Sequence, residues 1–562
     1  MPPTTTVRSC FRPPCAGLRT LALLALLPAA TAAQAGGAHH VYTWEGDAPG
    51  DRLGAAVGAA GDVDGDGFAD VIAGAPHADG AVPSSGAARV YSGATGVVLL
   101  ALEGPPEGGW FGAAVDGAGD LDGDGLPDLV IGAPLAGSAA GCAQVRSGHD
   151  GTPLWSWTGD LPGDRFGEAV AGAGDVDADG VPDLVIGAPH AAAPATLAGR
   201  VRVLSGGDGT VLHTFEGAWG DLLGAAVSSA GDVDLDGRAD VLVGAPLQDA
   251  GAFNAGAAYV FSGSDGATLH AFLGAQPGDQ LGDRVAHAGD VDADGWSDLL
   301  LGSPGADAAG IDSGAAEVRS GADGALLLYL TGGAGSEYLA AVAPAGDADA
   351  DGYADVAIGA ASSAAAAAEA GSVWIVSGAT GGELAALHGH EGFDWFGASL
   401  AGLGDTNGDG RFDLAVGAPG HDDDAAKAGK AHVLSGVALT LTSDVHAVSV
   451  SAGGGAQLSL LAGTARAGLP YYLLGSAAGT APGLAIGGLV LPLAFEPLYL
   501  PLTAQNPVAG TLDGSGHASV TLALESGSSP ALAGLTLHHA YLVLDAGVPV
   551  LASNAVPVTL TE

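Results

Sequence analysis

Short hydrophobic segments recur along most of the chain, and each follows a loop rich in aspartate. The first loop spans residues 62–70, and the apolar run 71–76 comes directly after it. The loop pattern is D-x-D/N-x-D-G-x-x-D, and an apolar run ending in Gly-Ala/Ser-Pro/Ala follows it each time. Seven copies begin at intervals of 55 to 58 residues, at Asp62, Asp120, Asp175, Asp232, Asp290, Asp347 and Asp405. This spacing predicts a repeat architecture.

Each repeat contains four strand-like segments, illustrated by the third copy. Residues 166–175 are small and apolar, 183–189 follow the acidic loop, 199–206 end in Ser-Gly, and 210–217 follow a Gly-Asp-Gly turn. These turns favour hairpins over crossovers. The second segment is apolar at consecutive positions, so we expect both of its faces to be covered. Four-stranded units of this length are typical of propeller blades. The predicted fold is all-β, a seven-bladed β-propeller.

The two ends of the repeat region are complementary. The seventh copy stops after 431–436 without a fourth strand, whereas residues 40–46 match the fourth-strand pattern of 212–217. We therefore expect the N-terminal segment to complete the last blade. Alternatively, residues 437–443 fill that place.

The two flanks of the propeller region have a different character. Residues 1–35 read as a signal peptide, with basic residues, the apolar run 21–27 and an Ala-Gln-Ala site at 33–35. A transmembrane anchor is the alternative, although the run is short for a bilayer. Beyond residue 436 the period is lost, and strand-like segments alternate with Gly/Pro turns. We predict a signal at 1–35, the propeller at 36–436 and a β-sandwich-like domain at 437–562.

The predicted C-terminal domain contains one strongly apolar stretch, residues 483–502. It could be mistaken for a membrane span, but Glu496 and three prolines interrupt it. We therefore expect no membrane span once the signal is cleaved, and a protein that is secreted or held at the cell surface. Cys10 and Cys15 would leave with the signal, and Cys142 would remain as a single cysteine without an intrachain disulfide.

The aspartate loops have the composition of a calcium site. Carboxylates at positions one, three, five and nine, with a backbone carbonyl at position seven, supply the hard oxygen ligands that Ca²⁺ prefers. An EF-hand is excluded because position twelve of the first loop is Ala73. We predict up to seven Ca²⁺ ions. The alternative is a set of solvated Asp-Gly turns.

The predicted metal ligands, loop by loop, are Asp62, Asp64, Asp66, Phe68, Asp70; Asp120, Asp122, Asp124, Leu126, Asp128; Asp175, Asp177, Asp179, Val181, Asp183; Asp232, Asp234, Asp236, Arg238, Asp240; Asp290, Asp292, Asp294, Trp296, Asp298; Asp347, Asp349, Asp351, Tyr353, Asp355; and Asp405, Asn407, Asp409, Arg411, Asp413.

Charge excludes two classes of partner. The 562 residues carry a formal charge of −47, and 27 of the 63 acidic residues lie in the loops. Even with seven Ca²⁺ bound, the charge would be about −33. A chain this acidic is not expected to bind nucleic acid or an anionic membrane.

Two short motifs, Phe-Gly and Gly-Ala-Pro, recur in the repeats. The FG position is Phe111-Gly112, Phe166-Gly167 and Phe396-Gly397, with Leu-Gly at 53–54, 223–224 and 281–282. The GAP motif begins at Gly74, Gly132, Gly187, Gly244 and Gly417, and the sixth repeat departs most, with Leu339-Ala340 and Gly359-Ala360-Ala361. With these motifs, the repeats resemble the FG-GAP repeats of the integrin alpha N-terminal propeller over about residues 40–436. It implies a propeller with calcium in some blades, whereas here all seven loops have a complete ligand pattern.

Two classes of function remain. The resemblance favours a non-enzymatic binding or adhesion module for an extracellular protein or glycan. The alternative is an extracellular polysaccharide hydrolase or lyase on a propeller scaffold. No catalytic residues are predicted, and the histidines at 388, 390, 538 and 539 read as surface residues rather than a transition-metal site.

A binding surface is expected on the face opposite the aspartate loops. There the loops between second and third strands vary in content, as at 247–254 and 421–424. The links between blades place Trp110, Trp219, Tyr338 and Trp395 near the same rim. Packing between blades is the alternative for these aromatics.

Overall fold

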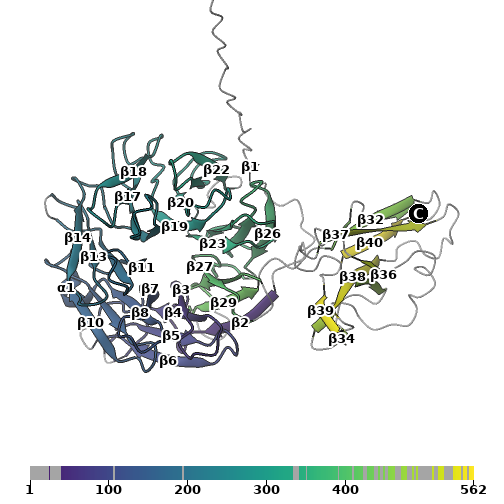
Figure 1. The fold of residues 1–562 in the computed structure, drawn as a ribbon, viewed down its shortest axis with the longest axis horizontal. Helices are drawn as coiled ribbons and strands as arrows, with labels where there is room; N and C mark the ends of the chain where they lie inside the picture. The colour runs from purple at the N-terminus through teal and green to yellow at the C-terminus, as the bar shows by residue number, and fades with distance from the viewer. Residues whose placement is uncertain are drawn as a thin grey trace, which may run out of the picture.

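The computed structural model describes residues 39–435, apart from positions 81, 106–107, 193–194, 333–338, 340, 350, 390, 408–410 and 422–426. Outside this range it describes β1 (Leu24–Ala25) and the strands β30–β40. Residues 39–435 form a ring of seven antiparallel four-stranded sheets (Figure 1). The prediction of an all-β, seven-bladed propeller is confirmed.

The first four blades follow the sequence in simple order, each with its strands hydrogen-bonded to the next. Blade one is β3 (Ala56–Gly61), β4 (Asp70–Ala75), β5 (Ala87–Tyr91) and β6 (Val98–Glu103); blade two is β7 (Ala114–Gly119), β8 (Asp128–Ala133), β9 (Cys142–Arg146) and β10 (Pro153–Thr158); blade three is β11 (Ala169–Gly174), β12 (Asp183–Ala188), β13 (Arg200–Leu204) and β14 (Val211–Glu216); blade four is β15 (Val227–Gly231), β16 (Asp240–Ala245), β17 (Ala257–Phe261) and β18 (Thr268–Leu273).

The remaining blades keep this order, and the short segment α1 (Ala136–Ala139) is a turn between β8 and β9. Blade five is β19 (Arg284–Gly289), β20 (Asp298–Ser303), β21 (Ala315–Arg319) and β22 (Leu326–Thr331), with β1 paired in parallel to β22; blade six is β23 (Ala341–Gly346), β24 (Asp355–Ala360), β25 (Ser372–Val376) and β26 (Glu383–His388); blade seven is β27 (Ser399–Gly404), β28 (Asp413–Ala418), β29 (Lys430–Ser435) and β2 (His39–Glu45).

The ring closes through the N-terminal strand, as predicted. β2 pairs with β29 in antiparallel register from His39↔Ser435 to Glu45↔Lys430. Trp44 of β2 then donates its indole N–H to the carbonyl of Gly96 in blade one, at 2.8 Å. The alternative filler is wrong, because β30 (Leu441–Ser443) pairs with β32 (Gly454–Leu461) instead.

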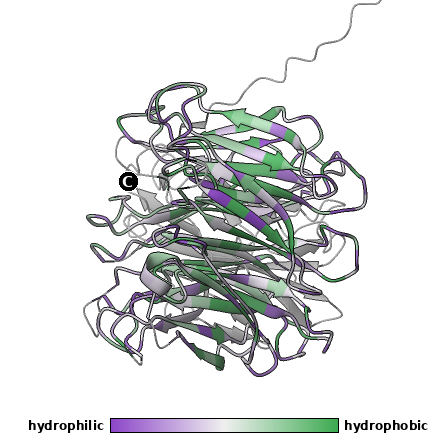
Figure 2. Cartoon of the chain, turned by 90° about the vertical axis from the view of Figure 1, so that its left-hand side faces the viewer, coloured by the Kyte–Doolittle hydropathy of each residue, from purple (hydrophilic) through white to green (hydrophobic). Residues whose placement is uncertain are grey.

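Apolar packing explains the continuous hydrophobic run of the second strand. Every residue of β4, β8, β12, β16, β20, β24 and β28 is buried. Each of these strands lies between two neighbouring blades, so both of its faces are covered, as the sequence predicted. In the side view of Figure 2 the strands cross the molecule and the loops project from its two faces.

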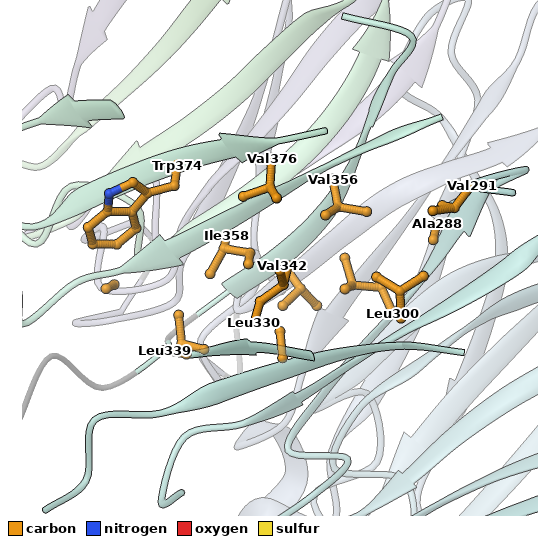
Figure 3. Packing of buried hydrophobic residues seen from close by; sticks show 13 residues of the cluster. Ala288, Val291, Leu300, Leu330, Leu339, Val342, Val356, Ile358, Trp374 and Val376 are labelled. Carbon is orange, nitrogen blue, oxygen red and sulfur yellow. The ribbon is translucent and has the colours of Figure 1, made fainter. Parts of the chain in front are cut away.

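Side chains from facing blades interdigitate in clusters, and Figure 3 shows the one between blades five and six. Leu300 and Leu330 of blade five meet Val342 and Ile358 of blade six, with Leu339 from the link between them. Leu339 replaces the phenylalanine of the FG motif and is buried. The divergent sixth repeat therefore still forms a packed blade.

The glycines of the FG and GAP motifs lie where neighbouring blades approach most closely. A Cβ on Gly74 would lie 1.9 Å from the carbonyl oxygen of Gly112, and one on Gly132 would lie 2.0 Å from that of Gly167. No side chain has room at such a distance. The two motifs are therefore the two halves of one backbone contact between blades.

Beyond residue 435 the described strands form three small sheets. One has the order β30-β32-β37, one the order β31-β40-β38-β33-β36 with β39 on β38, and one is the pair β34-β35. The bounds not yet given are β31 (Ala447–Ser449), β33 (Pro470–Ser476), β34 (Leu484–Ile486), β35 (Leu489–Leu491), β36 (Ala509–Thr511), β37 (His517–Leu524), β38 (Thr536–Asp545), β39 (Val548–Ala552) and β40 (Val556–Thr561). The β-sandwich and the three domain boundaries stay predictions.

Within the described residues, no helix is both long and apolar enough to span a membrane. The predicted signal lies outside the described residues except for β1.

Candidate metal centres

The aspartate loops share one hydrogen-bonding scheme, shown here for the first. Asp62 accepts the backbone N–H groups of Asp66 at 3.0 Å and Gly67 at 2.9 Å, one on each carboxylate oxygen. Asp64 accepts the N–H of Asp66 at 3.1 Å, and Asp66 accepts that of Phe68 at 3.0 Å. Short-range bonds of this kind wrap the loop around its carboxylates before any ion is considered.

The aspartate at position nine has a different role, because it begins the buried second strand. Asp70 is fully buried, and its two oxygens accept the N–H groups of Val63 at 2.8 Å and Gly93 at 3.0 Å. The latter group begins the turn between third and fourth strands. The same second bond recurs between Asp128 and Gly148, Asp183 and Gly206, Asp240 and Gly263, Asp298 and Gly321, and Asp355 and Gly378.

These bonds define two faces of the ring. The aspartate loops and the turns between third and fourth strands form one face, called here the aspartate face. The loops between second and third strands and the links between blades form the opposite one, called here the link face. The predicted arrangement of the two faces is confirmed.

The carboxylates converge closely enough to hold an ion in the first five loops. Three carboxylates of each loop place an oxygen within 4.8 Å of one another. The groups are Asp62, Asp64, Asp66; Asp120, Asp122, Asp128; Asp175, Asp177, Asp183; Asp232, Asp234, Asp240; and Asp290, Asp292, Asp294. An all-oxygen donor set of this density fits Ca²⁺.

Burial and mutual repulsion raise the pKa of several aspartates at position nine. The pKa of Asp70 is raised to about 6, mainly by burial and in part by the nearby Asp64 and Asp66, against the lowering effect of the backbone N–H bonds. The same causes raise the pKa of Asp298 to about 6 and that of Asp355 to about 7. A divalent cation among these groups would offset the repulsion, so their electrostatics also fit a calcium ion.

The sixth loop keeps the hydrogen bonds of the first, and the seventh departs from them in part. In the sixth, burial and then Asp351 and Asp347 raise the pKa of Asp349 to about 6. In the seventh, the side-chain amide of Asn407 donates to Asp413 at 3.1 Å. The predicted ligand Asp409 lies outside the described residues.

The position-seven residues each donate a backbone N–H to the aspartate at position five in loops one to six. Their predicted carbonyl role stays a prediction, and it concerns Phe68, Leu126, Val181, Arg238, Trp296, Tyr353 and, in the seventh loop, Arg411.

Acidification is expected to reduce the stability that calcium confers. The raised pKa values mean that the calcium-free fold binds protons more tightly than the unfolded chain. Without calcium, stability should therefore rise as pH falls through about 6 toward 4. Calcium requires ionised carboxylates, so calcium-loaded stability should fall over the same range. Melting temperatures in calcium and in dialysed, calcium-free buffer should converge between pH 7 and pH 5; a constant gap would contradict this.

Direct bonds between neighbouring loops are a feature that the sequence analysis missed. The N–H of Ala239 donates to the carbonyl of Asp175 at 2.9 Å, and Arg238 donates to that of Val176 at 3.1 Å. A matching bond joins Ala354 to Asp290. The third and fourth loops, and the fifth and sixth, are thus mechanically linked.

Buried aspartates in the links were also missed. Asp51 accepts the N–H of Ala48 at 2.8 Å, and Asp164 accepts that of Leu161 at 3.0 Å. Asp394 closes its link in the same way and also bonds His421 at 2.9 Å. The signal was present in the sequence, because each aspartate lies two residues before an FG or Leu-Gly pair.

The predicted rim aromatics take different environments. Trp219 is 72% exposed, Trp110 lies beside His77 at a ring separation of 4.9 Å, and Trp395 is covered by two cations. Tyr338 and the acidic positions 422–424 lie outside the described residues.

A family model described as FG-GAP repeat matches five segments of the chain, residues 53–91, 111–149, 166–204, 223–261 and 396–434. These segments are blades one, two, three, four and seven, and each runs from the FG position to the third strand. The chain carries FG-GAP repeats. Blades five and six have the same strands, although the matched segments leave them out.

Integrin alpha chains are distant homologues of this propeller. Integrin alpha-4 from Xenopus laevis is 33% identical over 197 residues, which are 32% of this chain and 18% of that integrin. Integrin alpha-5 from Xenopus laevis is 31% identical over 219 residues, 35% of this chain and 20% of the integrin. Integrin alpha-IIb from Homo sapiens is 36% identical over 146 residues, 23% and 14% respectively. The matches span a fifth or less of the length of these integrins.

Of the four histidines predicted to lie at the surface, the structure describes the side chain of His388. His388 is partly buried, bonds Ser372 at 2.8 Å and meets the Trp374 ring edge-on. It is therefore not the surface residue that the sequence suggested. Position 390 lies outside the described residues, and residues 538 and 539 lie within β38.

Proposed function

We propose that this protein is a secreted, non-catalytic binding module whose propeller is stapled by calcium and whose link face docks an extracellular protein. In this proposal residues 1–35 are a signal peptide and residues 437–562 an appended β-sandwich. The observation that carries it is the uneven distribution of exposed apolar side chains between the two faces.

Large apolar side chains are concentrated on the link face. Among the described residues, seven of the twelve exposed large hydrophobics lie there: Trp110, Leu161, Leu197, Trp219, Phe253, Ile311 and Phe393. Trp219, Phe253 and Ile311 are each more than 70% exposed. Aromatic side chains held in water on a rigid scaffold are typical anchors of protein interfaces.

Trp219 and Phe253 belong to loops that are bonded to one another. The N–H of Leu247, which begins the loop containing Phe253, donates to the carbonyl of Asp221 in the Trp219 link at 3.3 Å. The N–H of Leu222 in that link donates to Leu197 at 3.1 Å. Leu197, Trp219 and Phe253 therefore project from adjacent loops of blades three and four, which supports one continuous docking surface.

Calcium acts from the far side in this proposal. The carboxylate clusters lie on the aspartate face, where each position-nine aspartate ties two loops of its blade. Ions held there would fix the blades and leave the link face free for a partner. The homology to integrin alpha chains supports a protein partner and a location outside the cell.

Serine substitutions on the two faces test this assignment. Trp219→Ser with Phe253→Ser should weaken binding to a panel of immobilised extracellular-matrix proteins by about tenfold or more, because exposed anchors contribute most of an interface energy. Leu235→Ser is the matched control, since Leu235 is 61% exposed but lies on the aspartate face. Calcium content and melting temperature should stay unchanged in both. Loss of binding in the control alone would contradict the proposal.

The alternative, a polysaccharide hydrolase or lyase, needs an acid/base pair outside the calcium loops. Asp51 and Asp164 accept backbone N–H groups within their links, and Asp116 accepts that of Gly172. These bonds give the carboxylates structural roles. Release of reducing sugar from a polysaccharide panel would nevertheless favour the enzyme.

A further inference from the structure

Two cations on the link face differ from all others in the described part of this acidic chain. Ten of the twelve lysines and arginines there have hydrogen-bond or ion-pair partners, as in Arg89 with Asp47 and Arg200 with Glu216. Arg52 and Lys427 are the exceptions. Each contacts the ring of Trp395 instead, at 5.9 Å and 5.3 Å from its centroid.

Three loops bring these side chains together. Arg52 ends the link from blade seven to blade one, Trp395 ends the link from blade six to blade seven, and Lys427 lies in the loop between β28 and β29. The N–H of Arg52 donates to the carbonyl of Lys427 at 3.3 Å, and the N–H of Trp395 donates to that of Glu369 at 3.3 Å. All three backbones are left-handed, with φ of 58°, 57° and 58°. The cluster is therefore held by backbone geometry that non-glycine residues seldom adopt.

The nearby described carboxylates are already engaged. Glu369 accepts the indole N–H of Trp395 at 3.1 Å, Asp394 bonds His421, and Asp51 closes its own link. Among the described residues, these two positive charges thus have no carboxylate partner, although the molecule is strongly negative. Paired cations beside an aromatic ring are suited to a carboxylate.

We propose that Arg52, Lys427 and Trp395 form a binding site for an acidic peptide segment of a protein partner, in which a carboxylate side chain is followed by an apolar one. This inference rests on the proposed binding function and adds the chemistry of the partner. The cations would bind the carboxylate, and Phe393, 54% exposed in the Trp395 link, would contact the apolar residue.

The cations that lie over the Trp395 ring favour a peptide over an anionic glycan as the ligand. A sugar binds an exposed indole by stacking on its face, but here two cations lie over that ring. The exposed apolar side chain of the same link is that of Phe393. Alternating acidic and apolar side chains complement this arrangement better than a uniformly polar uronate chain.

The test uses the full calcium-loaded chain and short peptides that alternate aspartate with leucine. Calorimetric titration should show binding that weakens with added salt. A peptide with asparagine in place of aspartate should bind at least tenfold more weakly. The double variant Arg52→Gln/Lys427→Gln should lose at least tenfold in affinity for the acidic peptide.

Arg165→Gln is the matched control, because Arg165 occupies the same left-handed position before Phe166-Gly167 but is paired with Glu168. It should leave peptide affinity unchanged. Equal binding of the two peptides, or an unaffected double variant with an unchanged melting temperature, would overturn the site. If the chain binds oligogalacturonate but not the peptide, and the double variant loses that binding, the partner is a glycan and the proposed peptide class is wrong. If the Trp219→Ser/Phe253→Ser variant loses binding to matrix proteins but the Arg52→Gln/Lys427→Gln variant keeps its affinity for the acidic peptide, the proposed function stands and this site fails.

Discussion

Removal of calcium is expected to lower the melting temperature of the propeller by about 10 °C or more. An ion that binds only the folded state stabilises it by about 2.7 kcal/mol at a hundredfold excess over Kd, and up to seven sites add their effects. A domain of this size shifts by roughly 2 °C per kcal/mol. Differential scanning calorimetry measures the difference between two samples, one in calcium on the order of a few millimolar, to match an extracellular module, and one after exhaustive chelation.

The physical reason is the crowding of like charges on the aspartate face. Each of the first five loops gathers three carboxylates within 4.8 Å, and the backbone N–H bonds to them offset only part of their repulsion. Cys142 is the single cysteine of the described residues, so no disulfide restrains that part of the chain and the ions would be its main cross-links. Magnesium is the control ion, because it demands a smaller octahedral site and should restore little of the stability. An unchanged melting temperature after chelation would refute the calcium assignment.

Because neighbouring loops are hydrogen-bonded to one another, the loss of one ion is expected to disturb two loops. Asp175 accepts the N–H of Ala239 from the fourth loop through its backbone carbonyl, and Arg238 bonds the carbonyl of Val176. Disorder in the third loop would therefore reach the fourth. Blades two and three have Pro127 and Pro182 in place of Ala239, so they cannot donate the equivalent N–H.

The sequence predicted the parts of this fold that repeat within one blade. The period of the acidic loops gave the number of blades, and the consecutive apolar residues of β4 and its equivalents indicated burial on both faces. The match between residues 40–46 and other fourth strands predicted closure through β2. All of these signals lie within about sixty residues of one another or recur in register.

Contacts between blades were harder to predict, because their partners lie in different repeats and leave no period. The cluster of Arg52, Trp395 and Lys427 draws on residues more than 340 positions apart. Nothing in a local pattern distinguishes these cations from Arg89 or Arg200, which are neutralised by carboxylates. Whether a charge is paired is decided by which loops the closed ring brings together.

The sixth repeat is a second case in which the sequence pattern did not predict how two blades pack. Its FG pair is Leu339-Ala340, which marked it as the most divergent blade, yet Leu339 fills the interface with blade five. Leu339 is buried there, so a leucine takes the place of the phenylalanine of the FG motif. The blade therefore tolerates the departure at this position.

The role of the FG and GAP glycines can be tested by substitution. Gly244→Ala is expected to destabilise the propeller by about 3 kcal/mol or more, because overpacking a rigid contact forces the backbone to move. Its Cβ would lie 1.9 Å from the carbonyl oxygen of Gly282, and that residue has a φ of 84°, so the neighbour cannot easily shift.

Gly382→Ala is the control, at a turn glycine between β25 and β26. There the nearest described atom to the new Cβ is the hydroxyl oxygen of Thr380, at 3.1 Å, and a side chain can yield where a backbone carbonyl cannot. We expect the control to cost less than about 1 kcal/mol. Urea unfolding of both variants with calcium present measures the two costs. Equal destabilisation would mean that the glycines serve backbone flexibility rather than close approach, whereas a large cost confined to Gly244 would show that the motif pair sets the distance between blades.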